Sequence, residues 1–118
     1  MPSPDALRVL VADDDEAVRN ALARVLEDEG FRVVGLAADG AEAVELAQTL
    51  TPDAVVLDVR MPRVGGIEAA RRIGPRIRVV MLSAYDDPSL QQEAADAGAS
   101  CFLVKGCALS DLVEAVSG

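Results

Sequence analysis

The sequence predicts one doubly wound α/β domain, in which helices cover both faces of a parallel β-sheet. Strand-like and helical apolar patterns alternate along the 118 residues, as expected for repeated βαβ units. Hydrophobic residues make up 51% of the chain and aromatic residues only 3%, so the core must be aliphatic, which suits a parallel sheet buried on both faces. A chain of this length forms a single domain.

Five short apolar runs predict the strands of this sheet. They cover residues 7–12, 31–37, 53–57, 77–82 and 101–104. The run at 53–57 is apolar without interruption after Asp53. Such a run is typical of a central strand that is buried on both faces.

Five segments with helical spacing of apolar residues follow these runs. They include residues 16–29, 41–47, 66–74, 88–97 and 109–116. Gly30 and Gly98 match C-terminal caps, and Thr51-Pro52 ends the second helix because the residue before proline disfavours helical backbone. Asp87-Pro88 predicts an N-cap followed by proline in the first helical turn.

The strand ends predict where a functional site lies. Right-handed crossovers restrict the connections, and the flavodoxin-like order 2-1-3-4-5 is the natural one for five strands. In such sheets the functional crevice lies outside the carboxyl ends of the strands. Four of the runs stop at a residue that can hold a metal ion or a phosphoryl group, namely Asp13-Asp14, Asp58, Ser83 and Lys105.

The chemistry of these residues points to phosphoryl transfer assisted by a metal ion. Asp13 and Asp14 are the hard oxygen ligands that Mg²⁺ favours, and aspartate such as Asp58 is a known nucleophile toward phosphoryl groups. The Ser83 hydroxyl can donate to a phosphoryl oxygen, and the Lys105 ammonium suits a phosphate. Each residue alone also fits an ordinary turn, cap or solvated position, so the prediction depends on their conjunction.

Neighbouring acids and the composition limit this prediction. Asp15 and Glu16 are interpreted as helix-capping residues in the first turn. The chain has no His, and Cys101 and Cys107 are not in a CxxC spacing. This excludes a Cys/His metal site and imidazole acid–base catalysis, and it favours two reduced structural thiols. The net charge of −9 disfavours direct binding to nucleic acid by this segment.

The location of the protein is predicted from what the sequence lacks. No apolar run approaches the ~20 residues that cross a bilayer. The N-terminal residues 1–5 show neither a basic stretch nor an apolar core of a secretory signal, as such signals require. We therefore expect a cytoplasmic protein that does not associate with membranes.

Four motifs stand at the strand ends and their following loops, namely VADDDEAVR (11–19), VVLDVRMPRVGGIEAARRI (55–73), VVMLSAYDD (79–87) and CFLVKG (101–106). With these motifs the chain resembles, over about residues 6–117, the response-regulator receiver domain of two-component systems. Many receivers have proline after the lysine, whereas this chain has Gly106. That ending, together with residues 83–88, resembles receivers that carry a LuxR/NarL-type helix-turn-helix output domain.

The resemblance implies a role for each site residue. Asp58 matches the phosphoaccepting aspartate of the family. Asp13 and Asp14 match the acidic pair that holds Mg²⁺, for which Mn²⁺ could substitute, together with Asp58 and the backbone carbonyl of Arg60. Ser83 matches the hydroxyl residue that moves to bond the new phosphoryl group.

Further positions match the parts of the family that respond to phosphorylation. Lys105 matches the lysine that pairs with the phosphoryl group, and Phe102 stands where the family has its switch aromatic. Phe lacks the hydroxyl of Tyr, so a switch at this position would act by packing alone. Arg60 and Tyr85 match two variable positions that tune the phosphoryl lifetime, and small Ala84 leaves the site open.

The resemblance also implies a signalling switch rather than a metabolic enzyme. A sensor histidine kinase or a small phosphodonor would phosphorylate Asp58. The face formed by the fourth helix, the last strand and the last helix would then bind an output domain, a target protein or a second receiver as a homodimer. Transcription regulation through a DNA-binding output domain is expected. The chain contains no output domain, and we favour a segment of a longer regulator over a stand-alone receiver.

Three other classes of protein compete with this interpretation. An aspartyl phosphohydrolase carries a second acid two residues after its nucleophile, where this chain has Arg60. A flavin carrier of the same fold needs a loop after the first strand that cradles a phosphate, and residues 13–15 would repel it. The third alternative is a receiver that binds partners without being phosphorylated, and the sequence does not exclude it.

Overall fold

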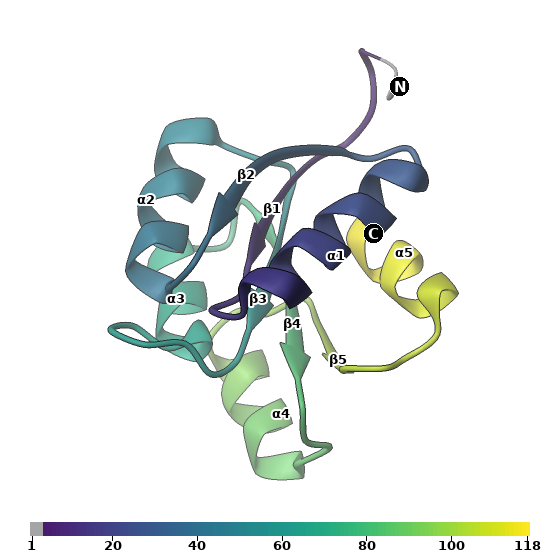
Figure 1. Ribbon diagram of the computed structural model, residues 1–118. Helices are drawn as coiled ribbons and strands as arrows, with labels where there is room; N and C mark the ends of the chain where they lie inside the picture. Colours follow the sequence, from purple (N-terminus) through teal and green to yellow (C-terminus); the bar gives the residue numbers. More distant parts are fainter. Residues whose placement is uncertain (1–3) are drawn as a thin grey trace.

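The computed structural model describes residues 4–118 and has one five-stranded parallel sheet in the order β2-β1-β3-β4-β5 (Figure 1). The strands are β1 (Arg8–Ala12), β2 (Arg32–Ala37), β3 (Ala54–Asp58), β4 (Arg78–Ser83) and β5 (Cys101–Val104). The helices are α1 (Glu16–Asp28), α2 (Gly40–Leu50), α3 (Gly66–Ile73), α4 (Pro88–Asp96) and α5 (Leu109–Ser117). The predicted flavodoxin-like fold and strand order are therefore confirmed.

The helices divide between the two faces of the sheet, because alternate strand residues point to opposite faces. Val9 and Val11 of β1 pack in a cluster with Leu26 of α1 and Leu112 of α5. Leu10 lies in the other cluster, which is built against α2, α3 and α4. Figure 1 shows the same division, with α1 and α5 together on one side of the sheet. Strand β3 is likewise buried on both faces, with Val55 and Leu57 in one cluster and Ala54 and Val56 in the other, as the uninterrupted apolar run at 53–57 predicted.

The observed elements correct some of the predicted boundaries. Phe31 does not begin β2: its N–H donates to the Leu26 carbonyl at 3.0 Å, which makes it part of the end of α1. Gly30 has φ 95°, as a left-handed C-cap requires. Helix α2 begins at Gly40, where the Asp39 side chain caps it by accepting from Glu42 N at 2.8 Å, and it ends at Leu50, before Thr51-Pro52 as predicted.

The other predicted caps are confirmed, and the described helices are short. Asp15 caps α1 by accepting from two backbone N–H groups, and Asp87 caps α4 ahead of Pro88. Among residues 4–118, no helix combines the length and apolar character that crossing a bilayer demands. The predictions about residues 1–3 lie outside the described residues.

The register of the sheet brings the strand ends to one level. Ala12 pairs with Leu57, so the residues that follow each of them, Asp13 and Asp58, emerge side by side. Asp58 pairs with Leu82, directly before Ser83. The polar residues at the ends of three neighbouring strands are therefore adjacent before any side chain is considered.

Candidate functional site

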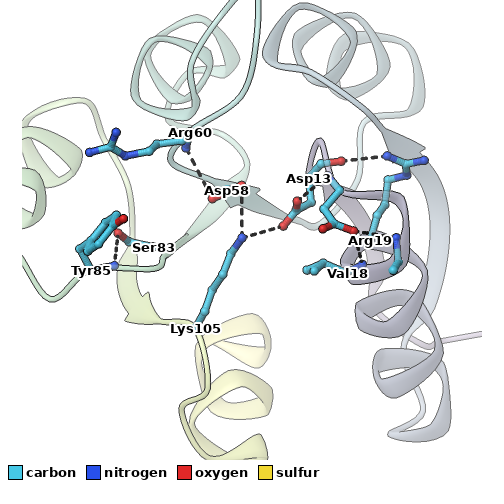
Figure 2. Close-up of polar contacts among 10 residues, drawn as sticks. Asp13, Val18, Arg19, Asp58, Arg60, Ser83, Tyr85 and Lys105 are labelled. Carbon is cyan, nitrogen blue, oxygen red and sulfur yellow. Dashed lines mark hydrogen bonds and ion pairs between the residues drawn. The ribbon is translucent and has the colours of Figure 1, made fainter.

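Asp13 is the most buried polar residue of the site, with 1% of its surface exposed. Its backbone N–H donates to the Ala37 carbonyl, which continues the β1–β2 ladder by one step. One carboxylate oxygen accepts from Asp15 N at 2.9 Å, and the other lies 3.1 Å from Lys105 Nζ (Figure 2). A buried carboxylate needs such partners, because removing an unpaired charge from water is costly.

Asp58, the last residue of β3, is buried beside Asp13. Burial, followed by the negative charge of Asp13, raises its pKa, although Lys105 and the Arg60 N–H act in the opposite direction. Lys105 Nζ lies 3.3 Å from one Asp58 oxygen, and Arg60 N approaches the other at 3.5 Å. The carboxylate is therefore held in place while its charge is only partly compensated.

Lys105 follows β5 and reaches both aspartates, as Figure 2 shows. Burial lowers its pKa, but the hydrogen bonds and charges of Asp13 and Asp58 outweigh that effect, so the pKa is raised and the ammonium stays charged. The chain after Lys105 turns through Gly106 at φ 91°, and Cys107 N donates to the Val104 carbonyl at 3.0 Å. This turn needs glycine at its third position, and it shapes the loop without the proline found in many receivers.

Asp14 completes a group of three carboxylates suited to a metal ion. One oxygen each from Asp13, Asp14 and Asp58 lies within 4.8 Å of the other two, and Asp14 is exposed. With Lys105 as their cationic partner, these three acids keep a net negative charge. Hard oxygen donors, excess negative charge and one open side are what Mg²⁺ favours, since it keeps several of its waters.

Ser83 is buried at the end of β4, next to this group. Its hydroxyl oxygen accepts from Tyr85 N at 3.0 Å, and its carbonyl accepts from Lys105 N at 2.7 Å. The hydroxyl therefore keeps its own proton for donation to another group. Ser83 lies where the sequence placed it, at the same level of the sheet as Asp58.

The side chains of Arg60 and Tyr85 contact one another beside Asp58. The Arg60 guanidinium lies 5.4 Å from the centre of the Tyr85 ring, within the range of a cation–π interaction. Tyr85 remains 58% exposed, and Ala84 is exposed as well. The pair thus forms one bulky border of the site.

Phe102 lies away from the carboxylates, in the third position from the end of β5. It pairs with Met81 in the sheet and is half-buried against the core cluster of α2, α3 and α4. This placement fits a packing role, and no described contact joins it to Ser83.

Arg19 was not identified from the sequence. Its guanidinium donates to the Asp13 carbonyl at 2.9 Å from the first turns of α1 (Figure 2). The available signal was its place one helical turn after the N-cap Asp15, where a long side chain reaches back to the strand end. Arg19 therefore helps to hold the backbone of Asp13.

A flavodoxin-like domain with an acidic cluster and a lysine at its strand ends belongs to the doubly wound proteins that bind ligands at that edge. The response regulator receiver domain is the family that matches, over residues 9–117. The chain belongs to this family, and so it is a receiver domain of the two-component response regulators.

Individual relatives agree with this assignment. The transcriptional regulatory protein PdtaR of Mycobacterium tuberculosis is 46% identical over 114 residues, which are 92% of this chain and 54% of PdtaR. The chain therefore spans about half the length of the curated relatives it matches. The receiver domain of the putative response regulator NarL from M. tuberculosis superposes with a TM-score of 0.91 at 36% identity, covering 97% of this chain and 95% of that one.

A third relative is a solved complex that includes a metal ion. The CheX–CheY–BeF₃–Mg²⁺ complex of Borrelia burgdorferi contains a chain that superposes with a TM-score of 0.87 at 31% identity. The match covers 93% of this chain and 86% of that one. That complex contains BeF₃ and Mg²⁺.

Proposed function

We propose that this domain is a phosphorylation switch in which Asp58 accepts a phosphoryl group from a sensor histidine kinase or a small phosphodonor. The observation that carries the proposal is the position of Asp58: it is buried next to Asp13 and Asp14 and lies 3.3 Å from a lysine ammonium. Transfer of a phosphoryl group requires a nucleophile and positive charge around the transferring oxygens. The relative that forms a complex with BeF₃ and Mg²⁺ supports the same chemistry.

In the proposed reaction, an Asp58 carboxylate oxygen attacks the phosphorus of the donor. The bond between phosphorus and the donor's nitrogen or oxygen breaks. The nitrogen of a histidine donor takes up a proton from the solvent as it leaves, whereas an acyl phosphate donor leaves as its carboxylate without taking up a proton. Mg²⁺ held by Asp13, Asp14, Asp58 and the Arg60 carbonyl would supply positive charge to the transferring group. Lys105, already within ion-pair distance of Asp58, would shift its contact to a phosphoryl oxygen.

The resulting change is proposed to spread to the face formed by α4, β5 and α5. Ser83 would donate a hydrogen bond from its hydroxyl to the phosphoryl group, since its oxygen only accepts from Tyr85 N and its proton is free. Phe102 could then pack into the space near Ser83. Phosphorylation would thereby shift a pre-existing equilibrium of this face, which binds an output domain, a target protein or a second receiver.

The role as a switch rather than an enzyme is part of the same proposal. The relatives of known description include a transcriptional regulatory protein about twice as long. We infer that this domain controls transcription through an output domain, in the cytoplasm, and turns over its own phosphoryl group slowly. An aspartyl phosphohydrolase is disfavoured because an Arg60 side chain, in contact with Tyr85, stands where its second acid would be.

Intact-protein mass spectrometry after incubation with acetyl phosphate tests the proposed function. We expect one phosphoryl adduct that forms with Mg²⁺, is strongly reduced with EDTA and is absent from Asp58→Asn. Beryllofluoride should shift NMR signals around Ser83 and Phe102 in the wild type. A protein that forms no adduct and shows no such shifts would instead be a constitutive interaction module on a receiver fold.

Removing the Arg60–Tyr85 pair is expected to shorten the life of the phosphorylated protein. The two side chains lie against one another at the border of the site, and we propose that they limit the approach of water to the acyl phosphate. Arg60→Ala and Tyr85→Ala should each accelerate dephosphorylation about threefold or more, since a cation–π pair contributes about 0.5–1 kcal/mol at an exposed site. The decay of the adduct after removal of acetyl phosphate measures this. Equal decay rates in the wild type, Arg60→Ala and Tyr85→Ala would contradict this prediction. Arg76→Ala, an exposed substitution away from the site, is the control.

A further inference from the structure

The loop that leaves Asp58 is held at both of its ends. Val59 N donates to the Leu82 carbonyl at 2.9 Å, and Gly66 N donates back to the Val59 carbonyl at 2.9 Å. The residues between Val59 and Gly66 therefore form a loop from the end of β3 to the start of α3, and the Gly66–Val59 hydrogen bond closes it. Arg60, whose carbonyl is a proposed metal ligand, lies at the beginning of this loop. In Figure 1 the loop extends next to the start of α2.

A third attachment joins the middle of the loop to α2. Arg63 Nη2 and Nε lie 2.7 Å and 3.0 Å from the same oxygen of Asp39. The other Asp39 oxygen caps α2 by accepting from Glu42 N. One carboxylate thus serves two purposes, a helix cap and an ion pair with the loop.

The backbone of the loop also packs directly against the start of α2. A Cβ atom on Gly40 would come within 1.9 Å of the Val64 carbonyl oxygen, so the first turn of α2 touches the loop directly. Arg63 itself has φ 65°, which is unfavourable for a residue with a side chain. The chain therefore adopts an uncommon conformation at the residue that makes the ion pair.

The Arg63–Asp39 ion pair is unsuited to stabilising the domain as a whole. The Arg63 side chain is 66% exposed, and exposed ion pairs contribute little to overall stability. The ion pair can still fix the position of the loop, because the Arg60 carbonyl lies only three residues before Arg63 in a short closed loop. Small shifts of such a loop move every group it carries.

We propose that Arg63 is a positioning residue, which uses Asp39 at the start of α2 to hold the loop after β3 so that Arg60 presents its backbone to the metal ion. The metal part of this inference rests on the proposed function. Through the ion pair, the first turn of α2 contributes to the phosphorylation site although it contains none of the residues that would contact the phosphoryl group.

Two conservative variants isolate the ion pair from the backbone. Arg63→Asn removes the guanidinium, and asparagine tolerates the left-handed backbone better than most residues. Asp39→Asn removes the charge, and asparagine remains a good N-cap for α2. Glu68→Gln is the matched control. It breaks the exposed ion pairs of Glu68 with Arg71 and Arg72, all within α3, and it changes the charge by the same amount as Asp39→Asn.

The experiment compares the full chain and these variants by hydrogen exchange and by NMR titration with MgCl₂. We expect the Gly66 amide to exchange about fivefold faster in both Asn variants. The apparent Mg²⁺ dissociation constant should rise about tenfold, the lower end for groups that orient metal ligands. The double variant should be no worse than either single one, because both remove the same interaction. The unfolding midpoint without Mg²⁺ should change little.

The proposal is overturned if Gly66 exchange and Mg²⁺ affinity in both Asn variants stay within twofold of the wild type, or if Glu68→Gln changes them equally. A rise in the dissociation constant that merely follows a lower unfolding midpoint would also overturn it. If the wild type binds no Mg²⁺, the proposed function fails, while the exchange rate of Gly66 still decides whether Arg63 holds the loop.

Discussion

Gly66→Ala is expected to lower the unfolding midpoint by roughly 10 °C, the equivalent of about 3 kcal/mol for a domain of this size. Gly66 is the buried first residue of α3, and a Cβ atom there would lie 2.1 Å from the Asp58 carbonyl oxygen. It would also come within 3.0 Å of Met81 Cε. The closest atom belongs to the backbone of β3, so α3 must move away from the sheet or the end of the strand must deform.

Gly65→Ala provides the matched control for this substitution. The nearest atom to its Cβ would be the Val59 carbonyl oxygen at 3.6 Å, an ordinary contact, and its backbone φ of −73° suits any residue. Thermal unfolding followed by circular dichroism should therefore separate two neighbouring Gly→Ala substitutions. A Gly66→Ala protein as stable as Gly65→Ala would mean that α3 is free to shift, and that the contact between α3 and Asp58 is loose.

Asp58→Asn is expected to raise the unfolding midpoint by about 2–5 °C at pH 7 without Mg²⁺. Burial and the charge of Asp13 raise the pKa of Asp58 above the usual value of 3.8. The folded state therefore binds this proton more tightly than the unfolded state, and stability falls as the pH rises from about 3.8 through the folded pKa. At pH 7 the ionised carboxylate destabilises the fold, and asparagine removes that effect.

The pH and the metal ion supply the tests of this explanation. The advantage of Asp58→Asn should disappear below the usual aspartate pKa, where both states of the wild type are protonated. It should also shrink in saturating MgCl₂, because a bound cation stabilises the ionised wild type. Glu45→Gln, an exposed change of equal charge in the middle of α2, is the control. An equal gain in that variant would show that net charge alone is responsible. A gain for Asp58→Asn that is independent of pH would show that ionisation of Asp58 is not its cause.

The sequence predicted the parts of the molecule that follow from regular structure. Asp13, Asp58, Ser83 and Lys105 come directly after or at the end of apolar runs, and parallel strands in register necessarily bring such positions to one edge. The class of fold followed from the alternation of strand and helix patterns. Errors were confined to the ends of elements, as at Phe31, where a helix cap competes with the start of a strand.

The contacts between loops could not be predicted in this way. Arg60 meets Tyr85, Arg63 meets Asp39, and Arg19 meets the Asp13 carbonyl. Each contact depends on the conformation of an irregular segment and on the reach of a flexible arginine, and neither has a periodic signal in the sequence. The left-handed backbone at Arg63 is a further example, since residue preference favours glycine or asparagine there.

The ion pair between Lys105 and Asp13 joins residues that are 92 positions apart in the chain. During synthesis Asp13 and Asp58 emerge from the ribosome well before Lys105, which pairs with both of them. A partly made chain therefore lacks the ammonium group that pairs with Asp13 and Asp58, and the site is assembled only when the last strand docks beside β4. If Asp58 accepts a phosphoryl group as proposed, it would do so only after the whole domain has folded.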